Sequence, residues 1–192
     1  MSNWKIRLIN DLEPVLSLPD PRPKISAYDN MPCAIFRYPP ENEFEFRVEI
    51  TMLQTRLEQA GKKITRISLA ECVVAALAAE DITYENLAEQ EKSIGLEKAI
   101  ETVSSILSDY QPLDRLVLER MPPSTDPTRD IVFILRAGSL FPVYRTSSLL
   151  EQMMGTIQIP AVLFYPGEMD GAAGLRFMGI LDAEHNYRPK IF

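Results

Sequence analysis

The stretch DIVFILRAG, residues 130–138, is the clearest secondary-structure signal in the chain. Five consecutive apolar residues, three of them β-branched, stand between an aspartate and an Arg-Ala-Gly segment. Such a short, bounded apolar run predicts a strand that is buried on both faces. IPAVLFYPG, residues 159–167, predicts a second strand of the same kind. Because helical patterns separate the strands, the sequence predicts a parallel sheet covered by helices on both sides.

The rest of the chain continues this alternation. PCAIFRY (32–38) and KKITRISL (62–69) predict two more strands, and the amphipathic run between them (41–61) predicts a helix with acidic residues in its first turn. Strand, helix and strand over about 37 residues is the size of a βαβ unit. Further elements are predicted as two helices (69–81 and 84–108, the second interrupted at Gly95) and an added strand (174–182).

The predicted fold class is therefore α/β, with a mostly parallel central sheet flanked by helices. Its layering is P-loop-like or Rossmann-like, but no phosphate-binding motif is present, since neither GxxxxGK[ST] nor GxGxxG occurs. The length fits a single domain, residues 1–192. An N-terminal helix is expected at about 4–16, shortened or kinked at Pro14, and an extended Pro-rich connector at 19–23.

Composition narrows the function classes. The formal net charge is -7 and the pI about 4.9, which disfavours direct binding to nucleic-acid phosphates. No apolar run reaches the roughly 18 residues that a membrane span needs, and the N-terminus lacks the features of a signal peptide. We therefore expect a cytoplasmic protein without a membrane partner.

Metal and nucleophile chemistry have few residues to use. A single histidine, His185, excludes metal sites that need several histidines, and it lies in a polar stretch typical of an exposed loop. Cys33 and Cys72 lack CxxC spacing and are expected to be buried, reduced thiols. Ser139 follows a strand but lacks the G-x-S-x-G pattern of a nucleophile elbow. We predict no catalytic residue, metal or cofactor.

Ligands of an open parallel sheet bind beyond the carboxyl ends of its strands. Two predicted loops reach that edge, RAGSLFPVYR after the strand at 131–135 and YPGEMDGAAG after the strand at 161–165. The first offers an anion or loop site formed by Arg136, Gly138, Ser139 and Arg145. In the second, Glu168 and Asp170 could ligate a divalent ion, although carboxylates two apart in a Gly-rich turn are common without one. If the two loops are neighbours, Arg136 or Arg145 should pair with Glu168 or Asp170.

The C-terminal part of the chain resembles a known family. Its most specific features are Gly138-Ser139, Phe141-Pro142, Arg145, Ser148-Leu149-Leu150, FYPGE at 164–168 and Leu175-Arg176-Phe177. These are similar to the BrxB family of bacteriophage-exclusion (BREX) defence systems. The resemblance implies a small cytoplasmic protein without an established enzymatic activity. It also implies a place beside a defence ATPase, a DNA methyltransferase and a PglZ-type protein of the alkaline-phosphatase fold.

The function expected from this resemblance is a non-enzymatic assembly subunit that binds the PglZ-type protein and, in addition, other BREX subunits. The alternative is a degenerate nucleotide-binding module in the same system, and self-association into a homodimer stays open. Interfaces favour aromatic residues, Met and Arg. The predicted partner-binding residues are Tyr144, Tyr165, Glu168, Met169, Asp170, Arg176 and Tyr187 at the C-terminal edge, and Trp4 and Arg7 at the N-terminus. Trp4 has an alternative role, which is to pack the first helix onto the core.

Overall fold

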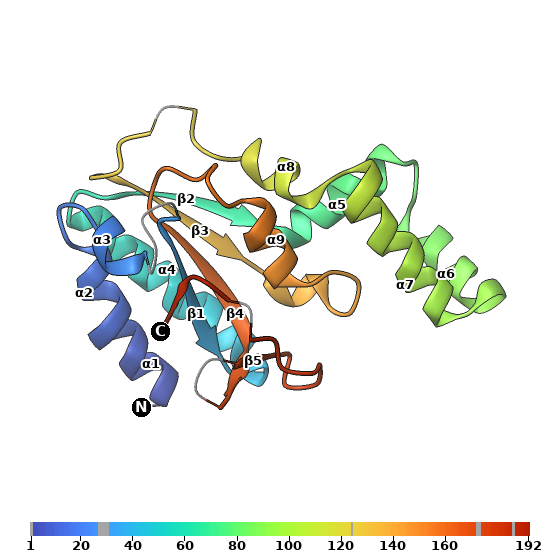
Figure 1. The fold of residues 1–192 in the computed structure, drawn as a ribbon, viewed down its shortest axis with the longest axis horizontal. Coiled ribbons are helices and arrows are strands. Elements are labelled where there is room, and N and C mark those ends of the chain that lie inside the picture. The colour runs from blue at the N-terminus through green and yellow to red at the C-terminus, as the bar shows by residue number, and fades with distance from the viewer. Residues whose placement is uncertain (1, 27–30, 124, 172–173, 186) are drawn as a thin grey trace.

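A central sheet organises the molecule (Figure 1). The computed structural model describes residues 2–26, 31–123, 125–171, 174–185 and 187–192. Within them the strands are β1 (Cys33–Tyr38), β2 (Lys63–Ser68), β3 (Asp130–Leu135), β4 (Ala161–Asp170), β5 (Gly174–Phe177) and β6 (Lys190–Ile191). The order is β2-β3-β4-β1-β6 with parallel neighbours throughout, and β5 pairs antiparallel with the far end of β4. The predicted fold class is confirmed.

The two strands of the predicted βαβ unit, β1 and β2, are not neighbours in the sheet. The chain leaves β1 through the long helix α4 (Glu43–Gln59) and passes β4 and β3 before it forms β2 at the edge of the sheet. Burial explains this placement. β1, β3 and the parallel part of β4 are buried almost throughout and fill the centre, whereas β2 exposes Lys63 and Arg66 and tolerates an edge.

Helices of the N-terminal third cover one face of the sheet. They are α1 (Asn3–Arg7), the π-turn η1 (Leu8–Leu12), α2 (Glu13–Leu16) and α4, with the short turns α3 (Arg22–Ile25) and η2 (Pro40–Asn42) between them. Pro14 does not end the first helix: the wider π-turn before it accommodates the missing N–H, and the helix continues to Leu16. Trp4, Leu8, Phe46 and Ile50 pack against the sheet as part of one buried cluster.

The sequence suggested an extended connector at 19–23, but the connector runs into a helical turn at its end. Residues Arg22–Ile25 form one helical turn in which Pro23 occupies an initial position, where a backbone N–H would have no partner anyway. The Asp20 carboxylate accepts hydrogen bonds from the Arg22 backbone N–H and from its guanidinium at 2.8–3.2 Å. An early proline and a capping aspartate are therefore sufficient for a short turn.

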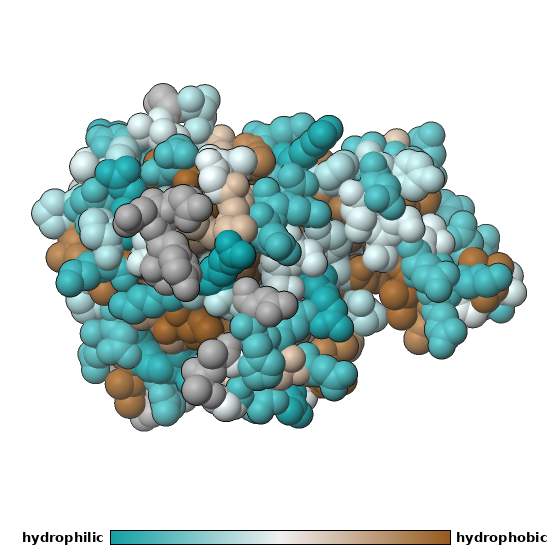
Figure 2. All heavy atoms as spheres, in the orientation of Figure 1, coloured by the Kyte–Doolittle hydropathy of each residue, from teal (hydrophilic) through white to brown (hydrophobic). Residues whose placement is uncertain are grey.

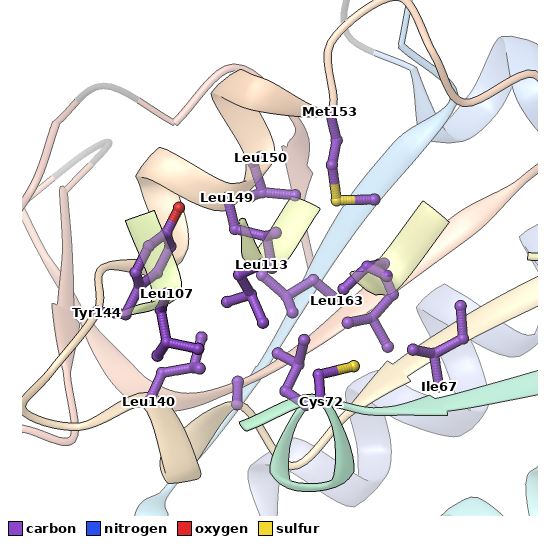
Figure 3. Close-up of a cluster of buried hydrophobic side chains, with 14 of the residues drawn as sticks. Ile67, Cys72, Leu107, Leu113, Leu140, Tyr144, Leu149, Leu150, Met153 and Leu163 are labelled. Atoms are coloured by element: carbon purple, nitrogen blue, oxygen red, sulfur yellow. The ribbon is translucent and has the colours of Figure 1, made fainter. Parts of the chain in front are cut away.

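The second face of the sheet is covered by α5 (Leu69–Ala79), the π-turn η3 (Ile106–Tyr110), α8 (Leu113–Leu118), the 3-10 turn η4 (Ala137–Leu140) and α9 (Thr146–Gln152). Two further helices, α6 (Tyr84–Ile94) and α7 (Leu96–Ser105), project beyond this layer. Figure 3 shows Cys72 of α5, Leu113 of α8 and Leu149 of α9 in one buried cluster with Leu163 of β4. Cys33 and Cys72 are both buried and free, as predicted.

Lys62 connects the N-terminal layer to the loop before β3. Its side chain is buried, and its ammonium donates hydrogen bonds to the backbone carbonyls of Leu18, Pro19 (3.3 Å) and Thr128 (2.7 Å). Burial lowers the pKa of this amine. Three backbone acceptors compensate the desolvated charge and tie the segment after α2 to the loop before β3.

Candidate functional site

A cavity of about 300 Å³ opens at the carboxyl edge of the parallel sheet. Tyr38, Ser68 and Leu135, the last residues of β1, β2 and β3, line its inner side. The outer side is formed by the first half of α4. This is the edge at which open α/β sheets bind ligands, but the cavity lies on the α4 face and not between the two loops that the sequence had singled out.

Charged side chains converge on this cavity from α4, β2, α5 and the segment after β3. Arg47 comes from α4, Arg66 from β2 and Arg136 from the segment after β3, opposite Glu43 and Glu71. The Glu43 carboxylate accepts a hydrogen bond from Arg47 Nε at 2.9 Å and lies 3.6 Å from Arg136 Nε.

Glu43 also accepts a hydrogen bond from the hydroxyl of Tyr38. Burial, reinforced by the adjacent Glu43 carboxylate, raises the pKa of Tyr38, so the phenol stays neutral and continues to donate. Since Arg47 and Arg136 also point their Nε atoms at it, Glu43 acts as the fixed centre of the cluster.

The four residues predicted for an anion site in the RAGS loop (136–139) and at Arg145 are not brought together around one cavity. Arg136 adopts a left-handed backbone conformation with φ of 63°, and the N–H and Oγ of Ser139 both donate to the Arg136 carbonyl, at 3.0 and 2.8 Å. Gly138 faces Met178 and Pro166. Of the four residues predicted for this site, only Arg136 lines the cavity, because the donors of Ser139 close their own 3-10 turn and Arg145 pairs elsewhere.

The PGEMD segment is a strand and not a turn. β4 continues through Pro166 and Gly167 to Asp170 and pairs with β5, with Gly167 opposite Phe177 and Glu168 opposite Arg176. A Cβ on Gly167 would lie 2.4 Å from the Arg176 carbonyl oxygen, so glycine serves the close approach of the two strands. The end of the predicted YPGEMDGAAG loop, at Ala172 and Ala173, lies outside the described residues.

The predicted ion pairs between the two loops are wrong. Asp170 pairs with Arg176 across the β4–β5 hairpin at 2.6 Å, and this hydrogen bond lowers the pKa of Asp170. Arg145 pairs with Glu184, and Arg136 with Glu43. The prediction failed because β4 carries its acidic residues beyond the end of β3, where the hairpin supplies a nearer cation.

Most aromatic residues predicted to bind a partner are part of the core. Trp4, Tyr144 and Tyr165 are buried, because each packs within one of the two hydrophobic clusters that cover the sheet. Tyr187 is half-buried, lies edge-on to Tyr165, and hydrogen-bonds Thr146 (2.9 Å) and Glu184 (3.1 Å). These four tyrosine and tryptophan side chains therefore stabilise the fold, and the alternative role of Trp4 is the one observed.

The charged residues of that prediction are distributed differently. Arg7 is half-buried, donates to the Arg37 carbonyl at 2.9 Å and lies over the Phe36 ring, and burial lowers its pKa to about 10. Glu168 and Arg176 are exposed, and Met169 and Asp170 are half-buried. The C-terminal candidates that remain available on the surface are thus those of the β4–β5 hairpin.

A projecting helical hairpin is the feature that the sequence analysis did not identify as a surface. We call residues 84–105, which comprise α6, Gly95 and α7, the arm. In Figure 1 the two helices lie side by side at the right, beyond the layers that cover the sheet. α6 has no buried residue. Ile94 (46% exposed) and Leu96 (59%) flank Gly95 at the tip, and Tyr84 is exposed at the start of α6. Figure 2 shows hydrophobic patches on the arm among polar atoms.

A second exposed apolar surface runs along α4. Phe44 (78% exposed), Val48 (55%) and Met52 (50%) follow one another at intervals of four residues, and we call them the outer stripe of α4. The buried residues of the same helix, among them Phe46 and Ile50, lie on its opposite side. The four-residue spacing of the outer stripe was a signal that could have been found in the sequence.

Neither a metal-ligand cluster nor a membrane-spanning helix is found among the described residues. In the described ranges, no group of three or more His, Cys, Asp or Glu side chains is arranged to hold a metal ion. His185 is exposed, as predicted. Across the described part of the chain, no helix combines the length and the apolar character needed to cross a membrane.

Comparison with known proteins complements this geometry. A family model described as "BREX protein BrxB" matches residues 65–191. The chain belongs to the BrxB family. A curated relative, the BREX protein BrxB of Bacillus cereus (strain H3081.97), is 27% identical over 158 residues, which cover 80% of this chain and 79% of the relative. No solved structure matches. The BrxB resemblance predicted from the C-terminal motifs is confirmed, and membership supports a role as a subunit of a BREX phage-defence system.

The range matched by the BrxB model divides the molecule. It contains most of β2, the arm, β3, β4 and β5, while α1 to α4 and β1 lie before it. The arm and the β4–β5 hairpin are therefore surfaces within the region that defines the family. The outer stripe of α4 lies outside that region.

Proposed function

We propose that this BrxB family member is a cytoplasmic, non-enzymatic assembly subunit of a BREX defence complex, and that it binds the PglZ-type protein of that system through the arm. Family membership supports the defence context. The single observation that carries the proposal is the arm itself, a projecting hairpin with an apolar tip inside the family-matched range.

The side-chain arrangement supports a role in assembly and not in catalysis. The Ser139 hydroxyl donates to a backbone carbonyl of its own turn. His185 is exposed in the C-terminal segment and lies against Gly174. A nucleophile and its base need to be within hydrogen-bonding reach of each other, and neither residue has such a partner. In the RAGS loop, the backbone N–H and hydroxyl of Ser139 both donate to the Arg136 carbonyl, which leaves neither free to hold a phosphate.

The arm has the chemistry of a docking element. Apolar residues exposed in a group and surrounded by charge are typical of interaction sites, and a few anchors of this kind carry most of the binding energy. Ile94 and Leu96 at the tip are such anchors. Five glutamates and two lysines lie in residues 84–105, so the arm is acidic. The complementary partner surface is an apolar pocket with a rim of lysine and arginine.

The proposal is tested by co-purification of the full chain with the PglZ-type protein encoded in the same BREX system, followed by measurement of Kd. We expect the double variant Ile94→Asp, Leu96→Asp to raise the Kd at least tenfold, since it places two charges in the apolar pocket. The melting temperature should stay close to that of the wild type because both side chains are exposed.

The matched control is Ile180→Asp, which changes an equally large apolar residue that is 71% exposed outside the arm. Its Kd should equal that of the wild type. Arg176→Ala tests the β4–β5 hairpin as the rival surface. Loss of binding in Arg176→Ala with full binding in the arm variant would transfer the docking site to the hairpin. Failure of the wild-type chain to bind the PglZ-type protein would remove that partner.

A further inference from the structure

The cavity at the carboxyl edge of the sheet has more positive charge than the surrounding residues neutralise. Three arginines line it, opposed by Glu43 and Glu71, in a protein whose formal net charge is -7. Of the arginines, Arg66 forms no ion pair with any residue that the structure describes. An unpaired arginine beside a cavity at this edge is positioned to meet an anion.

The other two arginines are held so that their terminal groups stay available. Arg47 and Arg136 approach Glu43 through Nε, and within the described ranges no hydrogen bond or ion pair occupies their Nη atoms. Arg136 is brought there by its left-handed backbone conformation, which a non-glycine residue rarely adopts. Glu43 therefore orients two guanidinium groups through Nε and leaves the parallel N–H groups of Nη1 and Nη2 free to bind phosphate or carboxylate.

The walls of the cavity combine this charge with apolar surface. Tyr38 and Phe46 stack with their ring centroids 3.8 Å apart, and Ile50 and Leu135 continue the apolar wall. The volume of about 300 Å³ lies at the lower end of the range of small-molecule sites. Inorganic phosphate alone would leave the apolar wall unused, whereas a phosphate ester with an organic group would contact both parts.

From this arrangement we infer that the cavity binds a small phosphorylated molecule, with the phosphate between Arg66, Arg136 and Arg47 and the organic group against the Tyr38–Phe46 wall. Two sources share this chemistry, a sugar phosphate and a mononucleotide. The inference is separate from the docking proposal, because no residue of the arm lines the cavity. It shares Arg136 with the site predicted in the RAGS loop but uses Arg47 and Arg66 in place of Gly138, Ser139 and Arg145.

The test is a calorimetric titration of the full chain with AMP, ribose 5-phosphate and inorganic pyrophosphate at matched ionic strength. We expect AMP or ribose 5-phosphate to bind. Arg66→Ala should raise the Kd at least tenfold, and Arg66→Lys by a smaller factor, because lysine keeps the charge but cannot donate two parallel hydrogen bonds. Because Arg66 is exposed and unpaired, the melting temperature of both variants should equal that of the wild type.

The control is Arg129→Ala, an exposed arginine that precedes β3 at the opposite edge of the sheet, and it should leave the Kd unchanged. Tighter binding of AMP than of ribose 5-phosphate identifies a nucleotide, and equal affinities identify a sugar phosphate. The inference is overturned if neither organic phosphate binds, if only pyrophosphate binds, or if Arg66→Ala binds as tightly as the wild type.

Discussion

The arm and α4 both expose large apolar side chains, but they differ in what the rest of the fold gains from them. α4 buries Phe46, Ile50 and two leucines on its inner side, so the helix is required by the core whatever its outer stripe does. α6 buries no residue. The arm contributes one buried residue, Val103, to the core around the sheet, and Leu87 packs against that core. Most of the arm adds chain length and exposed apolar surface, and such a feature needs a reason outside the stability of the monomer.

The largest expected effect on stability is in α4, where Phe46 is buried and Phe44, two residues earlier, is exposed. Phe46→Ala should lower the free energy of unfolding by about 3–5 kcal/mol, because it removes a buried ring from a cluster of aromatic residues. Phe44→Ala, at a site 78% exposed, should change it by less than about 0.5 kcal/mol. Equilibrium denaturation in urea measures both, and equal losses would contradict the two-sided description of α4.

The next largest effect on stability concerns Lys62, whose hydrogen bonds connect the N-terminal layer to the loop before β3. Lys62→Ala should cost about 2–3 kcal/mol, since three carbonyl acceptors lose their shared buried donor. The neighbouring Lys63 is exposed, and Lys63→Ala provides the control. The same denaturation experiment applies. A neutral Lys62→Ala would mean that packing alone holds this layer.

The smallest effect compares two helix N-caps. Thr83 and Asn86 form a capping box at the start of α6, and Ser68 caps α5 by accepting the Glu71 N–H. Each cap contributes about 1 kcal/mol. Ser68→Ala should lower global stability because α5 is part of the core, whereas Thr83→Ala should leave it nearly unchanged.

In Thr83→Ala the loss should appear instead as faster amide hydrogen exchange confined to α6, since local opening of this helix exposes no core. Exchange measured by mass spectrometry resolves the two cases. A fall in the global unfolding free energy of Thr83→Ala equal to that of Ser68→Ala would show that the arm unfolds together with the body.

The strands could be predicted from the sequence because burial on both faces leaves a local signature. The apolar runs at 130–138 and 159–167 became β3 and the parallel part of β4. Their neighbours could not be predicted in the same way. An apolar run indicates that a strand is central but not which strand lies beside it, so the sequence did not predict that β1 lies between β4 and β6.

The sequence analysis pointed to the carboxyl edge of the sheet, where the cavity lies, but of its candidate residues only Arg136 lines that cavity. Pro166 and Gly167 have the composition of a turn, yet glycine also permits two strands to approach closely, and only the presence of β5 decides between these roles. Arg66 was not singled out because it lies within a strand, where nothing local indicates that α4 and the segment after β3 bring two further arginines to it. Convergence of this kind depends on tertiary structure.

The sheet order also has a consequence for synthesis. β1 leaves the ribosome early, but its partners, β4 and β6, begin at residues 161 and 190. One of the most apolar strands therefore waits unpaired while more than half of the chain is made. Pairings between such distant segments form slowly and leave strand edges open to aggregation. We expect a nascent chain of this topology to bind chaperones until β4 has been synthesised and can pair with β1.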